Sequence, residues 1–504
     1  MSTLGRVSVA EWIARQLPAL VVLVPFTAAP LAYLLGTGFG RQIALISALL
    51  SQPLAILLAV TVVREGELRY EVGGWGGPLG IDLVVDGFTA VMVLVTTVVG
   101  LFVTVYALGY FGNRERYRFF WPLWLFLWGS LHALFLSGDI FNLYVCLELV
   151  SMSAVALVGL TLRREALVAA MRYMLAAILG SLFYLLGVAL IYGAFGSVDM
   201  QTLREVVRSD TTGQAALALM TVGLVLKTAL FPLHFWLPPA HSNAPSPVSA
   251  VLSALVVKGS FYILVRLWVD VAEPMAFPGV STVLGVLGST AIIWGSIQAF
   301  RQQRLKMLVA YSTVAQIGYL FLLFPLVTGG GQAAADAWMG GIFHAVSHAL
   351  AKSAMFLAAG TVLARFGHDR IDGLGGLSRR APVTAMAFGL AGVTMMGLPP
   401  SGGFVAKWQM IRASIESGEW WWAAVVVTGG LLAAAYVFRV VGPFFGREVD
   451  DLDDADLNAG PSPWTMESAA LVLAIGALVL GIVGQPLLDL IMVSAPALVA
   501  GVTP

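Results

Sequence analysis

Long apolar runs separated by short loops constrain this chain more than any other feature of its sequence. A helix that crosses a bilayer needs roughly 20 mostly apolar residues, and about fourteen runs meet that need. They are centred near residues 28, 52, 98, 127, 150, 181, 226, 258, 290, 316, 352, 396, 432 and 480. Only 11% of the residues are charged and the mean hydropathy is +0.88, whereas soluble domains carry about 25% charged residues. We therefore predict an all-α polytopic membrane protein.

The composition also excludes several classes of function. A net charge of zero gives no support for nucleic-acid binding. Cys146 is the only cysteine, which rules out an internal disulfide, a zinc finger and an iron–sulfur cluster held by this chain alone. The loops leave no room for a soluble catalytic domain, and no phosphate-binding glycine motif is present. We therefore expect no catalytic centre, no cofactor and no metal in this chain.

Basic residues in the loops predict the orientation. Loops after odd-numbered spans hold "GNRERYR", "LRRE", "RQQRLK", "RFGHDRIDGLGGLSRR" and "GRE", whereas loops after even-numbered spans hold only Arg64, Arg69, Arg204 and Arg208. The positive-inside rule places the odd loops in the cytoplasm and both termini outside. The start, "MSTLGRVSVAEWIARQ", has no cleavable signal pattern. The glycine-rich residues 72–80 are expected to form a turn-rich extracytoplasmic hairpin.

Lysine is scarce and lies in unusual places. Of the 28 basic residues five are lysine, and Lys227, Lys258 and Lys352 lie deep inside apolar runs. Lys407 lies near a helix end, where snorkelling to the headgroups is an alternative, and Lys306 is expected in a basic loop. A lysine in hydrocarbon costs about 3 kcal/mol. Arginine cannot release its proton in a protein, whereas a buried lysine can, so the pattern indicates proton transfer.

One acid and three further titratable residues extend this pattern. Glu148 lies within the fifth span, either as a neutral carboxyl bonded between helices or as the partner of Lys227. His344, His348 and Lys352 follow at four-residue spacing on one helix face. A metal site and satisfied interhelical histidines are alternatives. A proton relay fits groups that titrate near neutral pH better.

Two spans contain breaks. The seventh reads "KTALFPLHFWLPPAHSNAPSP", with His234 inside it, and the twelfth reads "MMGLPPSGGFVAKW". Both carry Leu-Pro-Pro, and each places a lysine beside the break. Broken helices at corresponding positions of two halves indicate an ion path in a repeat-built transporter. Because five spans separate them, such repeats would have inverted topology.

Six stretches resemble the antiporter-like subunits shared by respiratory complex I, membrane-bound hydrogenases and Mrp-type cation/proton antiporters. They are "LELVSMSAVALVG", "RYMLAAILGSLFYLLGVALIYGAFGS", "LKTALFPLHFWLPPAHSNAPSPVSAVLSALVVKGSFYIL", "QRLKMLVAYSTVAQIGYL", "HAVSHALAKSAMFLAAG" and "GLPPSGGFVAKW". They cover most of residues 85–445, and the third is highly specific. The lysine at position 407, the entrance region "VGGWGGPLGIDLVVDGFTAVMVLVTT" and the short segment after the last span make the chain most similar to the D-type subunits of Mrp antiporters.

The resemblance implies a fold and a set of roles. The family has fourteen helices with two inverted five-helix repeats, which divides the chain into helices 1–3 (1–110), a first repeat (111–272), a second repeat (273–446) and a loop with the last helix (447–504). The implied proton-transfer residues are Glu148, Lys227, Lys258, His344, His348, Lys352 and Lys407, and His234 joins them as a prediction from the seventh span.

The resulting hypothesis is a proton-translocating subunit of a multi-subunit Mrp-type Na⁺/H⁺ antiporter in a bacterial or archaeal inner membrane. Its expected partners are other membrane subunits, the lipid bilayer, protons and Na⁺. The alternative is a proton-pumping subunit of a complex I-like or hydrogenase redox complex, in which another subunit holds the redox centre. A transporter of an organic solute is a third class, but the buried polar residues are titratable rather than the amides that a solute pocket needs.

Overall fold

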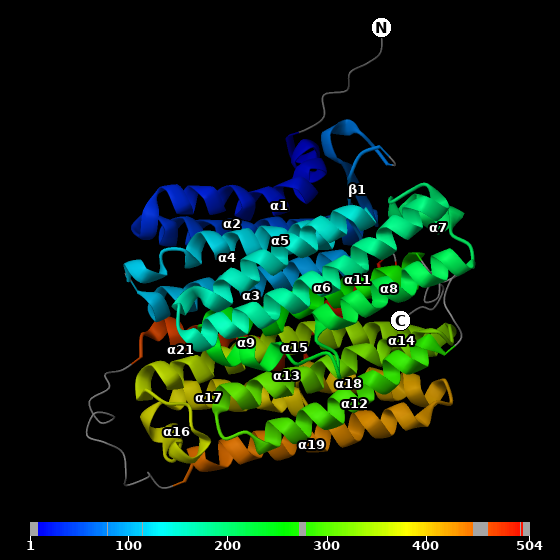
Figure 1. Ribbon diagram of the computed structural model, residues 1–504. Coiled ribbons are helices and arrows are strands. Elements are labelled where there is room, and N and C mark those ends of the chain that lie inside the picture. The colour runs from blue at the N-terminus through cyan, green and yellow to red at the C-terminus, as the bar shows by residue number, and fades with distance from the viewer. Residues whose placement is uncertain are drawn as a thin grey trace.

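The computed structural model describes residues 9–77, 79–112, 114–271, 279–446, 462–493 and 495–496, and it is almost entirely helical (Figure 1). The main helices are α1 (Val9–Leu34), α2 (Gly36–Glu65), α3 (Gly87–Phe111), α4 (Phe120–Leu136), α5 (Ile140–Val158), α6 (Arg164–Phe195), α7 (Met200–Val206), α8 (Thr211–Thr228), α9 (Leu237–Asn243), α10 (Ser246–Val251), α11 (Val257–Val265), α12 (Val280–Arg301), α13 (Leu305–Phe321), α14 (Leu323–Val327), α15 (Gly331–Phe366), α16 (Leu377–Arg380), α17 (Pro382–Met396), α18 (Gly402–Glu416), α19 (Trp420–Phe444), α21 (Trp464–Val479) and α22 (Gln485–Met492). Strands β1 (Leu68–Glu71) and β2 (Asp82–Val85), the 3₁₀ turns η1 (Val72–Gly74), η2 (Glu115–Tyr117), η3 (Gly159–Thr161) and η7 (Ile371–Gly373), and the π-helical segments η4 (Leu252–Val256) and η5 (Arg266–Val271) complete the set. The expected external end at residues 1–8 and the expected last loop at 447–461 lie outside the described residues.

Apolar length and apolar exposure identify a membrane protein. Within the described ranges, 11 helices are long and apolar enough to cross a bilayer. Their outer faces expose large aliphatic side chains such as Leu31, Leu175 and Leu431, which are 50%, 61% and 69% exposed. Large apolar surfaces promote aggregation in water, whereas lipid acyl chains cover them in a membrane. The three other expected spans, near residues 226, 396 and 480, are each divided into two helices: α8 and α9, α17 and α18, and α21 and α22.

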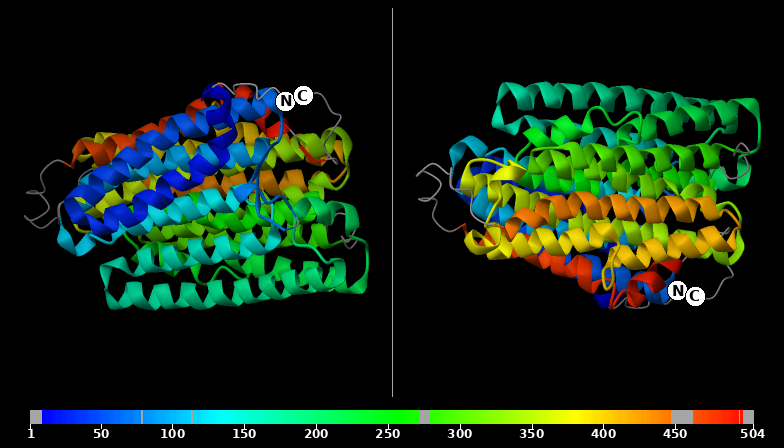
Figure 2. Two further views of the ribbon diagram at one scale, coloured as in Figure 1. Left: turned by 90° about the horizontal axis from the view of Figure 1, so that it is seen from above. Right: turned by 90° about the horizontal axis from the view of Figure 1, so that it is seen from below.

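The helices lie side by side in layers, with two of them enclosed. In Figure 1 the layer of α1 and α2 lies at one side and that of α12 and α19 at the other, and Figure 2 shows the same nearly parallel packing from above and below. Helix α15 packs against α3, α10, α13, α17, α18 and α21. The span that contains α10 and α11 is buried along its whole length. A helix that is apolar all round belongs in such an interior.

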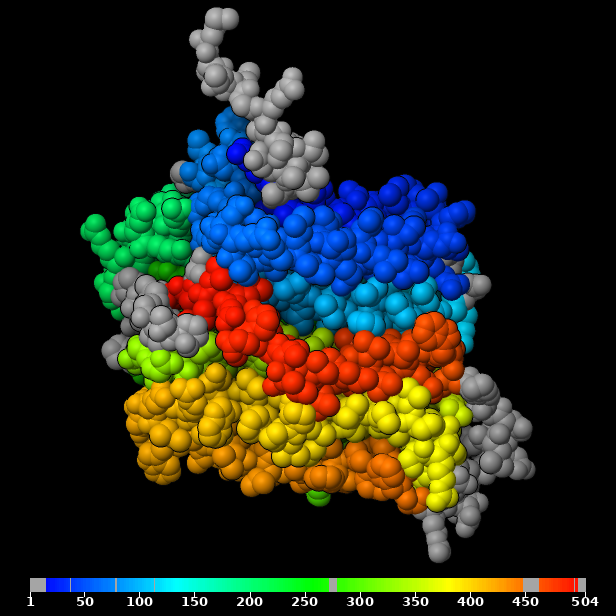
Figure 3. Space-filling model, turned by 180° about the vertical axis from the view of Figure 1, so that it is seen from behind, coloured from blue at the N-terminus to red at the C-terminus, as the bar shows by residue number. Residues whose placement is uncertain are grey.

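The last two helices, α21 and α22, pack against helices from distant parts of the chain: α21 contacts α3 and α17, and α22 contacts α3 and α15. Figure 3 shows α21 and α22, orange-red to red, lying across one face between the blue amino-terminal helices and the yellow and orange α17 and α19. The indole N–H of Trp338 donates to the carbonyl of Ile491 at 3.1 Å. The backbone N–H of Gly87 donates to the carbonyl of Val493, also at 3.1 Å. These bonds fix α22 against the starts of α3 and α15.

The predicted hairpin is confirmed, and its extracytoplasmic position stays a prediction. β1 and β2 pair antiparallel, with Leu68 opposite Val85 and Glu71 opposite Asp82. The connection turns through Gly73, whose φ of 72° is a left-handed conformation that glycine adopts without strain. An isolated bridge between Leu83 and Ser137 ties the hairpin to the end of α4.

Both predicted helix breaks are also confirmed. Helix α8 ends at Thr228, Ala229 follows with a left-handed φ of 59°, and α9 begins only at Leu237. Helix α17 ends at Met396 and α18 begins at Gly402. Proline provides no backbone N–H, so the carbonyls before each break lose their helical partners. A third irregularity is the π-helical segment η4, directly before Lys258, and π-bulges are frequent at functional sites.

Candidate functional site

All five lysines are buried. Their exposed fractions are 6% for Lys227, 0% for Lys258, 2% for Lys306, 0% for Lys352 and 5% for Lys407. The prediction that Lys306 lies in a basic loop is wrong, because α13 begins one residue before it. Its ammonium group donates to the carbonyl of Ala244 at 2.6 Å. The carboxylate of Asp369 accepts from the Lys306 backbone N–H and from Arg304, and so holds the following loop against this helix start.

Glu148 and Lys227 form an ion pair between α5 and α8. The Nζ atom of Lys227 lies 3.4 Å from Oε1 of Glu148 and donates to the hydroxyl of Ser151 at 2.9 Å. Ser181 on α6 donates to the same carboxylate oxygen. Charge-assisted hydrogen bonds normally measure about 2.7–2.9 Å, so the two serines hold the pair in a loose contact. The Glu148 side chain is 27% exposed against 3% for Lys227, which leaves the acid the more accessible partner.

Close helix packing sets the position of Lys227. A Cβ atom on Gly223 of α8 would lie 2.3 Å from the carbonyl oxygen of Gly180 on α6. A Cβ atom on Gly180 would lie 2.9 Å from Cγ of Lys227. Only glycine permits this approach. Lys227 also occupies the last turn of α8, where the helix dipole favours a cation.

Lys258 bonds directly to His348. The Nζ atom of Lys258 lies 2.8 Å from Nδ1 of His348, 2.7 Å from the carbonyl of Ala254 and 3.2 Å from that of Ser253. A charged ammonium has three N–H donors, and these three acceptors use all of them. The bond to Nδ1 also permits the reverse state, in which a protonated imidazole donates to a neutral amine. One proton can therefore belong to either group.

The two predicted α15 histidines stack. Their ring centroids lie 5.8 Å apart at 22°. Nε2 of His344 donates to the carbonyl of Gln316 at 3.2 Å. In the part of the chain that the structure describes, Nδ1 of His344 and Nε2 of His348 have no hydrogen-bond partner. One turn further along, Lys352 donates to the carbonyl of Val309 at 2.9 Å and to the hydroxyl of Ser312.

Lys407 lies against the second helix break. Its ammonium group donates to the freed carbonyls of Met395 at 2.9 Å and Met396 at 3.2 Å. It also sits 4.5 Å from the ring centroid of Tyr319. The His344 ring lies 5.3 Å from the same tyrosine ring. Tyr319 thus contacts both His344 and Lys407.

The predicted residues form two groups and one outlier. Lys258, His348 and His344 follow one another through direct contacts, and Tyr319 contacts both His344 and Lys407. Lys352 lies one helical turn from His348 on α15. Glu148 and Lys227 form the second group, and within the described ranges no hydrogen bond links them to the first. His234 is half-buried and stacks on Phe231 beside the exposed Phe235, and no hydrogen bond in the described part of the chain joins it to either group.

Several contact residues were missed by the sequence reasoning. Ser151 and Ser181 hold the Glu148 and Lys227 pair, Ser312 holds Lys352, and Tyr319 lies between His344 and Lys407. Serine and tyrosine are common inside membrane helices and have no distinctive spacing here. His241 and Lys306 carried a stronger signal, since each is a titratable residue beside an apolar run.

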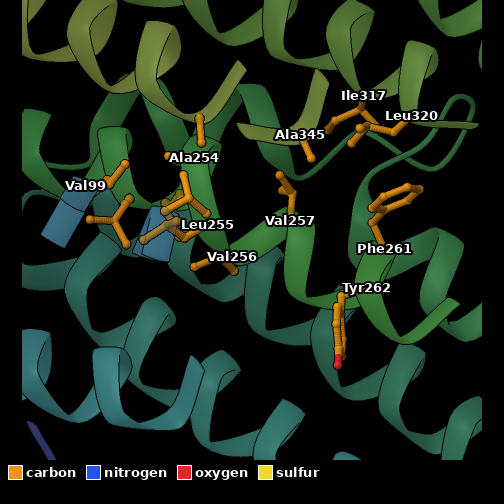
Figure 4. Close-up of a cluster of buried hydrophobic side chains, with 14 of the residues drawn as sticks. Val99, Ala254, Leu255, Val256, Val257, Phe261, Tyr262, Ile317, Leu320 and Ala345 are labelled. Carbon is orange, nitrogen blue, oxygen red and sulfur yellow. The ribbon is translucent and has the colours of Figure 1, made fainter. Parts of the chain in front are cut away.

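Buried apolar side chains lie on the helices that carry the first group. Figure 4 shows Ala254, Leu255, Val256 and Val257, the four residues before Lys258 in the sequence, together with Ile317 of α13 and Ala345 of α15. Apolar surroundings exclude bulk water and strengthen each electrostatic interaction inside them. Among the described residues, no group of three or more His, Cys, Asp or Glu side chains is placed to hold a metal ion.

A different arrangement lies at the carboxyl-terminal end of α11. Arg266 makes two bonds to the carboxylate of Asp86, at 2.5 and 2.6 Å, and a third to Asp270 at 2.8 Å. Burial alone would raise the pKa of Asp86, but the charge and hydrogen bonds of Arg266 outweigh burial and lower it. Asp86 therefore stays charged, and so does the arginine.

Comparison with known proteins gives consistent results. The family model described as "NADH:quinone oxidoreductase/Mrp antiporter, TM" matches residues 137–433. A second, described as "NADH-Ubiquinone oxidoreductase (complex I), chain 5 N-terminus", matches residues 76–120.

Similar proteins come from two kinds of complex. NADH-quinone oxidoreductase subunit N of Desulforudis audaxviator is 36% identical over 497 residues, covering 94% of this chain and 97% of that protein. The D-type subunit of the Na(+)/H(+) antiporter of Alkalihalophilus pseudofirmus is 29% identical over 364 residues, covering 71% and 72%. A chain in the structure of the Mrp complex from Dietzia sp. superposes with a TM-score of 0.85 at 26% identity, covering 95% of this chain and 96% of that one.

Proposed function

Because the chain belongs to the family of transmembrane subunits shared by NADH:quinone oxidoreductases and Mrp antiporters, we propose that it moves protons along its buried lysines and histidines as one subunit of a membrane complex. The observation that carries this proposal is the 2.8 Å bond between Lys258 and His348 inside an apolar interior. Two groups that can each hold the same proton there cost several kcal/mol to bury and give no evident stability in return.

The ion pair of Glu148 and Lys227 acts as the switch. While the contact persists, the carboxylate stabilises the charged form of Lys227. When Glu148 moves away, the buried ammonium loses its counter-charge and releases its proton more easily. The loose 3.4 Å geometry and the partial exposure of Glu148 support this role. The proton then passes through water to Lys258 and His348, then to His344 and Lys407.

The proposal includes a fourteen-helix topology with two inverted five-helix repeats. Together with the 11 candidate spans, the divided spans α8–α9, α17–α18 and α21–α22 supply the other three. The first repeat covers residues 111–272 and the second 273–446, so each contains one broken helix with a lysine beside it. We also place both termini outside the cell, on the basis of the arginine-rich loops.

Two versions of this function differ in what drives proton movement through the chain. In the first, the chain is a subunit of an Mrp-type antiporter and its proton flux is exchanged for Na⁺, as the likeness to the Mrp subunits supports. In the second, electron transfer in a partner drives it, which the 36% identity to a quinone oxidoreductase subunit supports. Purifying the tagged chain from its host and identifying the bound proteins decides between them. Proteins with redox cofactors support the second version, and small membrane subunits alone support the first.

The proton path itself is tested with Lys258→Met in the assembled complex. Methionine keeps the length and apolar stem but removes the group that shares a proton with His348. Removing a positioned proton-transfer group costs about 10²-fold or more in rate, so we expect proton transport in vesicles to fall by that factor. His234→Gln tests the one predicted proton-transfer residue that no described hydrogen bond joins to this group, and a loss of transport would add His234 to the path. Normal transport by Lys258→Met would contradict the proposed path.

A further inference from the structure

The outer face of α6 changes in character along its length. Arg164, Val168 and Arg172 follow at four-residue spacing on one helix face, and Leu175 and Leu179 continue that face further along the helix. Val168, Leu175 and Leu179 are 44%, 61% and 50% exposed, and both arginines are also exposed. Figure 2 shows α6 and α8 along one outer edge of the bundle in both views. The face is therefore basic near the arginine-rich loop and aliphatic where the helix crosses the membrane.

The depth of Arg172 distinguishes it from a loop residue. Helix α6 runs from Arg164 to Phe195 and has 32 residues, which gives a length of about 48 Å at about 1.5 Å per residue. A hydrocarbon core about 30 Å thick takes up roughly 20 of these residues. With the helix centred in the bilayer, roughly six residues project at each end, and Arg172 lies about 4 Å inside the edge of the core. An arginine at that depth extends its side chain to the level of the lipid phosphates.

Neither Arg164 nor Arg172 takes part in an ion pair or a side-chain hydrogen bond within the described ranges. Arg304, by contrast, pairs with Asp369 at 2.9 Å. A guanidinium group cannot become neutral in a protein, and a charge near hydrocarbon is costly without a partner. The positive charges on this face of α6 therefore need a counter-charge from outside the chain.

An open groove lies beside these two arginines, between α6 and α9. Its cavity volume is about 290 Å³. Arg164, Glu165, Val168 and Arg172 line one side, and Pro239 and Asn243 of α9 line the other. Glu165 is the one carboxylate among the lining residues, so the lining carries a net positive charge. The groove is large enough for a phosphodiester group.

We propose that this groove binds the phosphate of an anionic phospholipid. Arginine forms two parallel N–H···O bonds with a phosphate group, and basic pockets between transmembrane helices on the cytoplasmic side suit anionic headgroups. Arg164 and Arg172 hold the phosphate, and the acyl chains lie along Leu175 and Leu179. A phospholipid fits better than a free anion, because exposed aliphatic side chains continue directly from the basic groove. This site does not depend on the proposed proton path.

A lipid in the groove contacts α6 and also the segment that follows the first helix break. Tyr173, next to Arg172, stacks on Trp236, with ring centroids 4.4 Å apart at 6°. The indole N–H of Trp236 donates to the carbonyl of Leu226 at 2.9 Å, and Leu226 directly precedes Lys227. The bound lipid thus stabilises the packing of α9 on α6, beside the end of α8.

The test uses the co-purified complex, delipidated in detergent and titrated with dioleoylphosphatidylglycerol while native mass spectrometry counts the bound lipids. Arg164→Gln combined with Arg172→Gln should bind the tightest lipid about 30-fold more weakly than wild type. Arg301→Gln combined with Arg370→Gln removes two exposed arginines outside the groove and should bind that lipid as wild type does. The lipid should also raise the unfolding temperature of wild type more than that of the groove variant. Equal affinity of wild type and the groove variant overturns the proposal.

Three further arms identify the occupant. Millimolar inorganic phosphate should leave phosphatidylglycerol binding unchanged, and displacement of the lipid by phosphate would show a free-anion site and overturn the proposal. Val168→Trp fills the groove but keeps both arginines, and it should weaken lipid binding as the arginine variant does. Should the arginine variant fail to assemble, Val168→Trp decides alone, and wild-type affinity in it overturns the proposal. Loss of a co-purified subunit from the arginine variant with unchanged lipid binding would show a protein partner in the groove and overturn it as well.

Discussion

The buried cations of this chain have two kinds of surroundings. Arg266 carries a permanent charge, and Asp86 and Asp270 pair with it. Lys258, Lys352 and Lys407 instead have carbonyl, hydroxyl and imidazole acceptors. Lys227 is the one lysine among the described ion pairs. A buried charge without a counter-charge is strongly disfavoured, whereas a neutral lysine is not. The surroundings of the lysines therefore permit release of a proton, and those of Arg266 do not.

A substitution at Asp86 tests whether the ion pair with Arg266 stabilises the folded protein. Asp86→Asn leaves the buried guanidinium short of one counter-charge, and breaking a buried pair in this way costs about 3–5 kcal/mol. We expect the detergent-solubilised variant to unfold at clearly lower denaturant concentration than wild type at pH 7. Glu115→Gln, at an exposed pair with Arg118, is the control and should unfold like wild type.

The pH dependence of the stability difference between wild type and Asp86→Asn follows from the lowered pKa of Asp86. A carboxyl group whose pKa is lower in the folded state contributes stability above its unfolded value, about 3.9. That contribution is lost as the pH falls through the folded pKa. The stability difference between wild type and Asp86→Asn should therefore be constant from pH 7 to about pH 5 and shrink only below about pH 4. A difference that shrinks between pH 7 and pH 5 would contradict the ion-pair assignment.

At the scale of helices, the spacing between α6 and α8 sets the position of Lys227. Gly223→Ala places a methyl group 2.3 Å from the Gly180 carbonyl oxygen, and such overpacking costs about 1–3 kcal/mol. We expect the helices to separate, the contact between Lys227 and Glu148 to lengthen, and transport to fall while the complex still assembles. Gly193→Ala on the same α6 is the matched control, since a Cβ atom there has open space. Equal transport by both variants would show that this helix spacing is unimportant.

The helices and their breaks were predicted from the sequence more reliably than the contacts between helices. Apolar length predicted the 11 candidate spans and proline predicted both helix breaks, because these features act through the local backbone. The positions of Glu148, Lys258 and His348 followed from periodicity and from the family resemblance. Lys306 was misplaced because a basic run looks like a loop, and only the contacts of Asp369 and Ala244 reveal its burial. The complete burial of His241 depends on its packing against Phe356, between α9 and α15, which no single-helix pattern contains.

For the whole molecule, the proposal requires partners. The chain offers ion-carrying groups but no readable energy source, and Glu148 is still partly accessible at its surface. We expect the purified single chain in liposomes to show no sodium-dependent proton exchange, and the co-purified complex to show it if the Mrp version holds. Robust exchange by the single chain would contradict a subunit role.

The orientation is tested separately. A reporter fused after Arg380, in the loop between α16 and α17, should read cytoplasmic, and one fused near Asp210, at the start of α8, should read external. The reversed pattern would contradict the assignment.

Proton transport by Lys227 variants tests the central claim most directly. Lys227→Arg keeps a positive charge that can pair with Glu148, but it cannot release a proton at physiological pH. Lys227→Ala removes both properties. The measurement is proton transport in vesicles, normalised to assembled complex, for wild type and both variants. If Lys227 is a proton carrier switched by Glu148, both variants assemble and neither transports. If Lys227 only braces the break after α8, the arginine variant transports nearly as wild type does, and the carrier account is wrong.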